Sequence, residues 1–238
     1  MDDMIRLTDV RFRWSPASEP VLDIAEFSVA RGERVFLAGP SGSGKSTLLS
    51  LLGGVAVPDR GRTEVMDTDL AALSGRERDR FRADHIGFVF QMFNLLPFLP
   101  VIGNVTLPCL FSASRQAKAE RSSGSVEAEA ERLLQAMGLD PALTAGRSAA
   151  ELSVGQQQRV AAARALIGAP ELIVADEPTS ALDADMRRAF LDLLFGEVAR
   201  AGSTLLFVSH DRSLEALFDR TVRIEDINAA GRTDASGS

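Results

Sequence analysis

The chain of 238 residues is 45% apolar and 25% charged, which is the composition of an ordinary soluble globular protein with room for a substantial core. Its net charge of −7 argues against nucleic acid as the main partner, because binding to phosphate backbones depends on clustered Lys and Arg. One cysteine, Cys109, and two histidines exclude an internal disulfide and make a metal site of His and Cys unexpected.

The first elements along the chain are expected to be antiparallel β-strands. Ile5–Val10 and Phe27–Val29 alternate between apolar and polar side chains, as half-buried strands do. The N-terminal sequence MDDMIRLTDV lacks the basic and apolar regions of a secretory signal. We therefore expect the protein to remain in the cytoplasm.

Later strands have a different pattern and alternate with helices. Four short, nearly continuous apolar runs predict buried parallel strands at Val35–Ala38, Ile86–Phe90, Leu172–Ala175 and Leu205–Val208. Helical patterns lie at about Lys45–Leu52, Val126–Met137, Gln156–Ile167 and Met186–Arg200. Strands that alternate with helices predict an α/β fold with a mostly parallel sheet.

The middle of the chain, at about 93–150, is mostly helical in pattern, and we interpret it as a helical subdomain inserted into the sheet domain. It begins within the uncharged stretch Ile86–Ser114, whose prolines and polar side chains exclude a membrane-spanning helix. Further on, the polar run Arg115–Ser125 predicts a solvated loop. One domain is expected over residues 1–228, and the small, polar residues 229–238 are expected to be disordered.

The strongest chemical signal is the sequence GPSGSGKS, which follows a predicted strand and opens a predicted helix. This is the phosphate-binding loop pattern in its required context. Its glycines let backbone N–H groups turn toward phosphate oxygens, and the helix N-terminus adds partial positive charge. Lys45 is expected to reach the β- and γ-phosphates, and the Ser46 hydroxyl to bind Mg²⁺. The expected nucleotide contacts are Gly39, Pro40, Ser41, Gly42, Ser43, Gly44, Lys45, Ser46 and Thr47.

Two carboxylates, Asp176 and Glu177, end the third apolar run. They lie at the strand edge where open α/β sheets bind ligands. Asp176 is expected to hold Mg²⁺, and Glu177 to be the general base that orients or deprotonates the attacking water. Two acids after a strand are often only the start of a solvated loop. The phosphate-binding loop in the same chain favours the functional interpretation.

A family resemblance is carried by Glu151–Arg159, ELSVGQQQR, which resembles the signature motif of ATP-binding-cassette (ABC) proteins, usually L-S-G-G-Q. Val154 replaces a glycine there and restricts the backbone, which we expect to be tolerated. Other family elements follow the same order: Gln91 resembles the Q-loop residue, Ser180–Asp183 the D-loop, and His210 the switch histidine. The resemblance implies a P-loop NTPase core with an antiparallel β subdomain and an inserted helical subdomain.

The resemblance also implies roles for single residues. Gln91 would contact Mg²⁺ and the attacking water, and His210 would bond to the γ-phosphate or that water. Trp14 resembles the aromatic residue that stacks on adenine, with Phe12 as a substitute and a core position for Trp14 as the alternative. A histidine after a strand is usually without chemical function, but its place after the Asp-Glu strand favours function.

The signature motif predicts a dimer. Ser153 is a natural N-cap and Gly155 leaves the helix start open, which makes a second anion site that has no lysine. The resemblance implies that Ser153, Gly155 and Gln156 close on the γ-phosphate of ATP held by a second copy, and that Asp183 crosses the interface. Its alternative role is to cap the helix that follows it. We expect a homodimer around two ATP and Mg²⁺.

The sequence FNLLPF, residues 93–98, resembles the branch of the family that serves lipoprotein release and macrolide efflux. This implies an ATPase that drives transmembrane permease subunits and is peripheral on the cytoplasmic face of the inner (plasma) membrane. Met92–Leu99 is expected to be the docking surface, with subdomain core as the alternative. Two rivals are a cassette that acts on DNA or ribosomes, which usually carries a second cassette, a coiled coil or zinc motifs, and a scaffold that does not hydrolyse ATP. Intact Lys45, Glu177 and His210 argue against the scaffold.

Overall fold

The structure is a computed structural model that describes residues 3–140 and 146–230. The chain divides into two compact units. Unit 1 comprises Met1–Asp79 and Ser209–Ser238, and unit 2 comprises Arg80–Val208.

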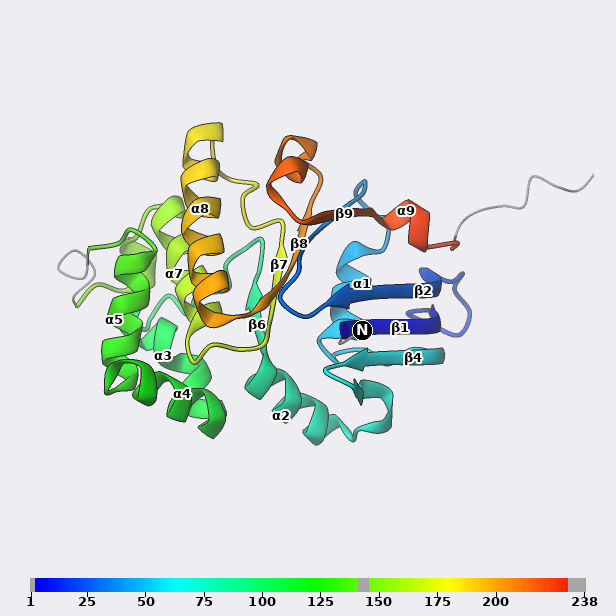
Figure 1. The fold of residues 1–238 in the computed structure, drawn as a ribbon, viewed down its shortest axis with the longest axis horizontal. Coiled ribbons are helices and arrows are strands. Elements are labelled where there is room, and N and C mark those ends of the chain that lie inside the picture. Colours follow the sequence, from blue (N-terminus) through cyan, green and yellow to red (C-terminus); the bar gives the residue numbers. More distant parts are fainter. Residues whose placement is uncertain (1–2, 141–145, 231–238) are drawn as a thin grey trace, which may run out of the picture. The chain divides into compact units, whose positions relative to one another are not determined.

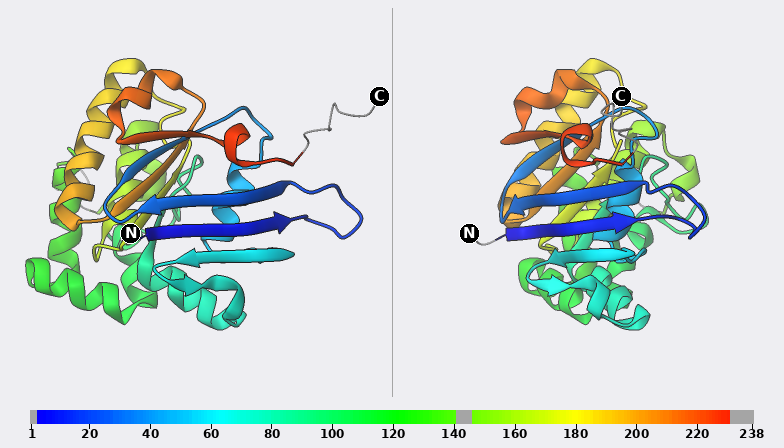
Figure 2. Two further views of the ribbon diagram at one scale, coloured as in Figure 1. Left: turned by 45° about the vertical axis from the view of Figure 1, so that its right-hand side comes forward. Right: turned by 90° about the vertical axis from the view of Figure 1, so that its right-hand side faces the viewer.

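Unit 1 contains an antiparallel sheet in which β1 (Asp3–Phe12) is central, with β2 (Leu22–Ala30) on one side and β4 (Arg60–Val65) on the other (Figures 1 and 2). Short strand β5 (Thr68–Asp69) pairs with β4 and leads into a 3₁₀ turn at Leu70–Ala72. In β1 the side chains of Ile5 and Leu7 are buried while those of Arg6 and Thr8 are exposed, so the alternation of the sequence does specify which face enters the core. The antiparallel prediction is confirmed.

Unit 1 also contains a parallel pair, β3 (Arg34–Ala38) with β9 (Arg220–Arg223). Helix α1 (Lys45–Leu52) follows β3 after a loop of six residues, 39–44, and buries Leu48, Leu51 and Leu52. The C-terminal part contains a 3₁₀ segment at Arg212–Leu217 and a short helix α9 (Ile224–Ile227). The strand, loop and helix order that the phosphate-binding loop requires is therefore present.

Unit 2 contains three parallel strands, with β7 (Leu172–Asp176) between β6 (Ile86–Val89) and β8 (Thr204–Ser209). Val174 at the centre of β7 faces Phe88 on one side and Leu206 on the other. Residues 172–175 are all buried, as expected for a parallel strand that is covered on both faces.

Helices of unit 2 gather around α7 (Val154–Leu166), which packs on β6 and on α3 (Val101–Phe111), α5 (Val126–Ala136) and α8 (Ala184–Ala201) (Figure 1). A Cβ atom at Gly87 in β6 would lie 2.2 Å from the Ala165 carbonyl oxygen, so only glycine lets α7 approach the strand this closely. The other elements are α2 (Gly75–His85), α4 (Ala113–Ser123) and a 3₁₀ turn at Ala149–Glu151.

These elements confirm the α/β, P-loop NTPase fold with its parallel and antiparallel strands. Helices α3, α4 and α5 lie in the region where a helical subdomain was expected, and its boundaries at 93 and 150 stay a prediction. Among the described residues, no helix is long and apolar enough to cross a membrane. Residues 231–238 of the expected disordered tail lie outside the described residues.

The solvated loop expected at Arg115–Ser125 is wrong, because residues 113–123 form helix α4. The Ser112 hydroxyl caps the helix by accepting from the Arg115 N–H at 3.0 Å, and Gly124 ends it in the left-handed conformation. Arg115 is buried, and it donates to the carbonyl oxygens of Ala165 at 2.7 Å and Ile167 at 2.8 Å near the end of α7. This polar segment thus forms a helix that contacts the end of α7, because Arg115 provides hydrogen bonds to buried carbonyl groups there.

An ion cluster at Glu171 joins the loop before β7 to helices α2 and α4. Its carboxylate oxygens lie 3.0 Å from His85 Nδ1 and 2.7 Å from Lys118 Nζ. Burial by itself raises the pKa of Glu171, but the hydrogen bonds to His85 and Lys118 outweigh it, and the net result is a pKa lowered from 4.5 to about 2.

This cluster predicts a loss of stability in acid. A carboxyl group whose pKa is depressed by folding stabilises the folded state above its ordinary pKa of 4.5 and loses that contribution as the pH falls toward about 2. Urea unfolding midpoints measured across this range should fall steeply for the wild type and less for Glu171→Gln. Asp192→Asn, which removes a largely exposed ion pair with Arg188, is the matched control and should retain the wild-type slope.

Candidate nucleotide site

The phosphate-binding loop is shaped by the backbone that surrounds it in unit 1. Gly44 has a φ of 97°, and a Cβ atom there would lie 2.9 Å from Leu22 Cδ2. Helix α1 starts at the next residue, and no side chain caps its N-terminus. The loop therefore presents the helix start and its partial positive charge to a ligand, as an anion site requires.

Lys45 lies across this loop. Its side chain is 8% exposed, and the ammonium group donates to the carbonyl oxygens of Gly39 and Pro40, each at 2.7 Å. The Ser43 hydroxyl also donates to the Pro40 carbonyl, at 2.8 Å. The ammonium group is thus held at the mouth of the loop by neutral acceptors, which a phosphate anion can displace because charge-assisted hydrogen bonds are stronger.

A second group of predicted site residues lies at the carboxyl ends of β6 and β7, in unit 2. The register pairs Val89 with Ala175, so Gln91 follows one strand and Asp176 and Glu177 follow or end its neighbour. Gln91 is exposed and the two acids are half-buried. These three predicted site residues are brought to one edge of the unit 2 strands.

Glu177 has an unusual backbone conformation. Its φ is 48°, in the left-handed region that a residue other than glycine rarely adopts, and Pro178 follows it. The Glu177 N–H donates to the Val208 carbonyl oxygen at 2.9 Å, which fixes the residue against β8. Strain of this kind costs about 1–3 kcal/mol and is concentrated at functional sites.

The segment after Gln91 contains both buried and exposed apolar side chains. We call Met92–Leu99 the docking segment. Met92 is 81% exposed and Phe98 is 75% exposed, whereas Phe93 is buried. Some apolar side chains of this segment are therefore exposed, and the alternative of subdomain core applies to Phe93.

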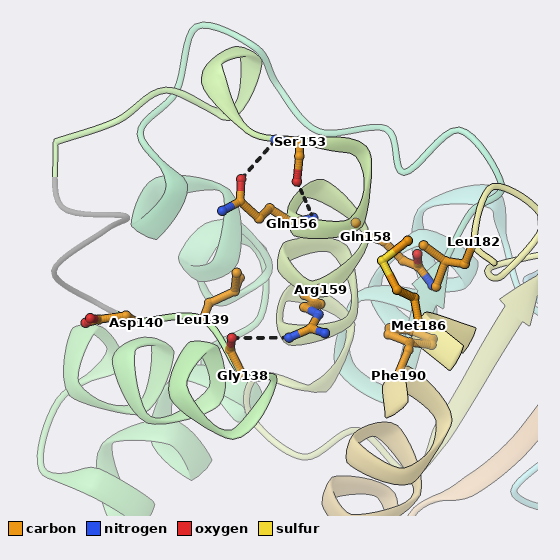
Figure 3. A pocket seen from close by; sticks show the side chains of 11 residues that line it. Gly138, Leu139, Asp140, Ser153, Gln156, Gln158, Arg159, Leu182, Met186 and Phe190 are labelled. Carbon is orange, nitrogen blue, oxygen red and sulfur yellow. Dashed lines mark hydrogen bonds between the residues drawn. The ribbon is translucent and has the colours of Figure 1, made fainter. Parts of the chain in front are cut away.

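The signature motif forms the start of α7 (Figure 3). Ser153 and Gln156 make a reciprocal capping box: the Ser153 hydroxyl accepts from the Gln156 N–H at 3.4 Å, and the Gln156 carbonyl Oε1 accepts from the Ser153 N–H at 2.9 Å. Val154 is the first residue of the helix and its side chain is 51% exposed. The valine that replaces the usual glycine therefore begins the helix with its side chain in solvent.

A pocket of about 240 Å³ lies beside the signature motif, between α7, α8 and the chain after α5 (Figure 3). Ser153, Gly155 and Gln156 line one part of it, and Leu182, Met186 and Phe190 line another. Gln158 also lines it, and the side-chain amide of this buried residue has no hydrogen-bond partner among the described residues. The pocket places the start of the signature helix next to the D-loop.

Asp183 ends the D-loop and caps α8, because its Oδ1 accepts from the Met186 N–H at 2.8 Å. This confirms the capping role that the sequence predicted for it. Asp183 itself is exposed. Its expected role across a dimer interface stays a prediction.

The remaining predicted residues belong to unit 1. His210 follows β8 directly and is exposed. Trp14 is 62% exposed, which excludes a core position for it, whereas Phe12 is buried at the end of β1. The two rings meet edge to face, with centroids 5.0 Å apart. Trp14 is therefore the member of this pair with an accessible ring.

Each residue that the sequence predicts to bind Mg²⁺ carries a suitable donor atom. The Ser46 hydroxyl, the Gln91 amide oxygen and the Asp176 carboxylate are all oxygen ligands, which Mg²⁺ prefers. Within residues 3–140 and 146–230, no three His, Cys, Asp or Glu side chains form a cluster that could hold a metal ion by themselves. One carboxylate together with substrate phosphates is the usual arrangement for Mg²⁺.

Sequence reasoning missed Arg164, a buried cation in α7. Its guanidinium donates to the carbonyl oxygens of Asn94 at 2.6 Å and Phe93 at 2.5 Å, and so supports the docking segment. The signal was an arginine in the otherwise small and apolar run AAARALI. A buried arginine in such a run must find acceptors, but the sequence does not show which ones.

Strand, glycine-rich loop and helix, together with acids at the end of a parallel strand, define the class of P-loop nucleotide-binding proteins. Residues 22–180 match the family model described as ABC transporter. By this match over most of its length, the chain belongs to the ABC transporter family, and it is an ATP-binding and ATP-hydrolysing cassette of that family.

Relatives and solved structures agree with this assignment. The chain is 43% identical over 222 residues to the lipoprotein-releasing system ATP-binding protein LolD of Anaeromyxobacter dehalogenans, covering 93% of this chain and 88% of the relative. It is 40% identical over 225 residues to the macrolide export ATP-binding/permease protein MacB of Marinobacter nauticus, covering 94% of this chain but only 33% of that protein. The cassette MJ0796, solved as a dimer in a post-hydrolysis state bound to ADP and Pi, is 34% identical with a TM-score of 0.79, covering 92% and 94% of the two chains.

Proposed function

We propose that the chain is the motor subunit of a membrane complex in the lipoprotein-release and macrolide-efflux branch. The observation that carries this proposal is the presence, in one chain, of a phosphate loop with a lysine and of a second helix start, at Ser153, whose first residues 153–158 include no lysine or arginine. The phosphate loop would bind nucleotide by itself, whereas the helix start at Ser153 would need a nucleotide that is held by a second copy. Its relatives named LolD and MacB support the branch.

The phosphate loop would bind ATP through residues 39–47, with the Lys45 ammonium on the β- and γ-phosphates and Trp14 stacked on the adenine. Ser46, Asp176 and Gln91 would hold Mg²⁺, which when bound neutralises charge that develops between the phosphates. Glu177 would orient and deprotonate the attacking water, and His210 would donate to the γ-phosphate. Catalysis in this arrangement comes mainly from positioning and electrostatic stabilisation.

Two copies would sandwich two ATP molecules. Ser153, Gly155 and Gln156 of each copy would meet the γ-phosphate that is bound to the phosphate loop of the other, and Asp183 would lie at the interface. The dimeric state of the MJ0796 cassette supports this arrangement. ATP binding then closes the dimer, and hydrolysis reopens it.

This proposal predicts hydrolysis that depends on protein concentration. Each site is complete only in a dimer, so phosphate release per milligram of isolated subunit should rise with protein concentration until dimers saturate. Release should stop when EDTA removes Mg²⁺ and return when Mg²⁺ is added. A specific activity that is constant across concentrations, in protein that sedimentation shows to be monomeric, would exclude a shared site.

Attached transmembrane permease subunits would convert this cycle into movement, and the chain would then lie on the cytoplasmic face of the plasma membrane. The docking segment suits this role, because an exposed apolar surface on a loop that follows Gln91 links a partner to the site. Burying one large apolar anchor such as Phe98 contributes roughly 1.5–3 kcal/mol.

Phe98→Asp should therefore abolish co-purification with the membrane partner but leave folding and basal hydrolysis of the free subunit unchanged. The side chain is largely exposed, so the substitution removes no core packing. Leu110→Asp is the matched control: it puts the same charge at an exposed apolar position near the end of α3, outside the docking segment. A Phe98→Asp subunit that binds its partner as well as the Leu110→Asp subunit contradicts the docking role.

A further inference from the structure

A buried arginine joins the signature helix α7 to the docking segment. Arg164 lies in α7, and its guanidinium donates to the carbonyl oxygens of Phe93 and Asn94. Burial lowers the pKa of this guanidinium. Among the described residues no carboxylate pairs with it, so its charge is satisfied by these two carbonyl groups.

The backbone that carries these carbonyls has an unusual shape. Phe93 has a φ of 57° and Asn94 a φ of 49°, so both residues are in the left-handed region. This conformation turns their carbonyl oxygens toward α7. A different backbone conformation at either residue would leave a buried cation without its acceptor, which is strongly unfavourable.

A second buried side chain holds the same segment further along. Asn104 of α3 accepts from the Leu96 N–H at 2.8 Å and donates to the Leu96 carbonyl oxygen at 3.0 Å. Helix α3 packs against α7. The main chain of the docking segment is thus fixed to the helices beneath it, while Met92 and Phe98 stay exposed.

Helix α7 therefore connects the signature motif, at its start, to the docking segment, which Arg164 contacts. Helix α7 begins next to Ser153 and holds Arg164 about 16 Å further along, at 1.5 Å per residue. We propose that Arg164 is a positioning residue that couples the backbone of the docking segment to the state of the signature helix. When the signature motif closes on the nucleotide of a second copy, the backbone conformation of the docking segment then changes. In return, docking of a partner changes the position of the signature motif. This inference rests on the proposed function.

Hydrogen exchange can test it without any membrane partner. Glu177→Gln subunits are brought to the ATP-bound dimer with ATP and Mg²⁺, and exchange of the amides in residues 92–99 is compared with that of the nucleotide-free monomer. We expect exchange in this segment to change by about fivefold or more, at the low end of typical coupling between sites. The same comparison after adding Arg164→Lys should show little change, because an ammonium group cannot hold two carbonyls in the geometry of a guanidinium fork.

Arg159→Lys is the matched control. It lies in the same helix, and its guanidinium also donates to two carbonyl oxygens, those of Met137 at 3.1 Å and Gly138 at 3.2 Å, but it does not contact the docking segment. The response to ATP should persist in this variant.

An ATP-bound dimer whose docking segment exchanges like that of the monomer overturns the inference and leaves the proposed function intact. So does an Arg164→Lys variant that responds as fully as Arg159→Lys. The first of these comparisons involves no change at position 164, so poor folding of the lysine variant cannot protect the inference. Failure of the Glu177→Gln subunit to dimerise with ATP overturns the proposed function and the inference with it.

Discussion

Glu177→Gln should reduce ATP turnover by about 10²- to 10⁴-fold, the usual contribution of general acid–base catalysis, while nucleotide binding is retained. Glutamine keeps the size of the side chain but removes the base. The backbone of residue 177 is fixed by its hydrogen bond to Val208 and by the proline after it, so the substitution should not move the site. Phosphate release and nucleotide affinity are the two measurements.

The same variant should accumulate as a dimer. Without hydrolysis the closed state has no route to reopening, so size-exclusion chromatography with ATP and Mg²⁺ should shift the protein from monomer to dimer. ADP should not produce this shift. Asp185→Asn, which removes an exposed acid in the first turn of α8, is the control and should hydrolyse ATP as the wild type does. A Glu177→Gln variant that hydrolyses ATP at the wild-type rate would show that Glu177 is not the general base.

Lys45→Ala should weaken nucleotide binding itself, by about 10- to 100-fold, because a hydrogen bond to a charged group contributes roughly 1.5–3 kcal/mol. The loss of its bonds to Gly39 and Pro40 also removes support from the loop, so thermal melting must show that α1 and the loop remain folded. Nucleotide affinity equal to that of the wild type would contradict the assignment of the phosphate loop.

Mixing two inactive variants tests the shared sites directly. In a dimer of Lys45→Ala with Ser153→Arg, one site combines the intact phosphate loop of one copy with the intact signature of the other. Random exchange between equal amounts should restore about a quarter of wild-type hydrolysis if the sites act independently, because half of the dimers are mixed and each has one intact site. No recovery, once exchange has been demonstrated by labelled subunits, argues against composite sites.

Much of the fold could be predicted because local signals and tertiary packing agree. Lys45–Leu52 was predicted as a helix and is α1 without change, and the alternation in Ile5–Val10 identified the buried face of β1. Strand β9 and helix α4 were not predicted. Strand β9 is short and its side chains are mostly not buried, so it lacks a continuous apolar run. Helix α4 looked like a loop because its sequence is polar, and the sequence does not show that Arg115 is buried.

The candidate site could be predicted as residue types but not as geometry. The phosphate loop and the acids of β7 follow from spacing, because the backbone conformation of such loops depends on glycines and on the strand before them. Contacts that join distant residues leave no local pattern. The bonds from Arg164 to Phe93 and Asn94 span 71 and 70 positions, and only the folded chain shows them.

Trp14 gives the protein an optical property of its own. The chain has one tryptophan and no tyrosine, so its near-ultraviolet fluorescence originates almost entirely from one ring that is largely exposed at the end of β1. An adenine that stacks on this ring would quench the emission, whereas binding elsewhere would leave it nearly constant. The unlabelled subunit thus carries a built-in fluorescent probe for the step in which the base is bound, separate from the phosphate contacts that govern hydrolysis.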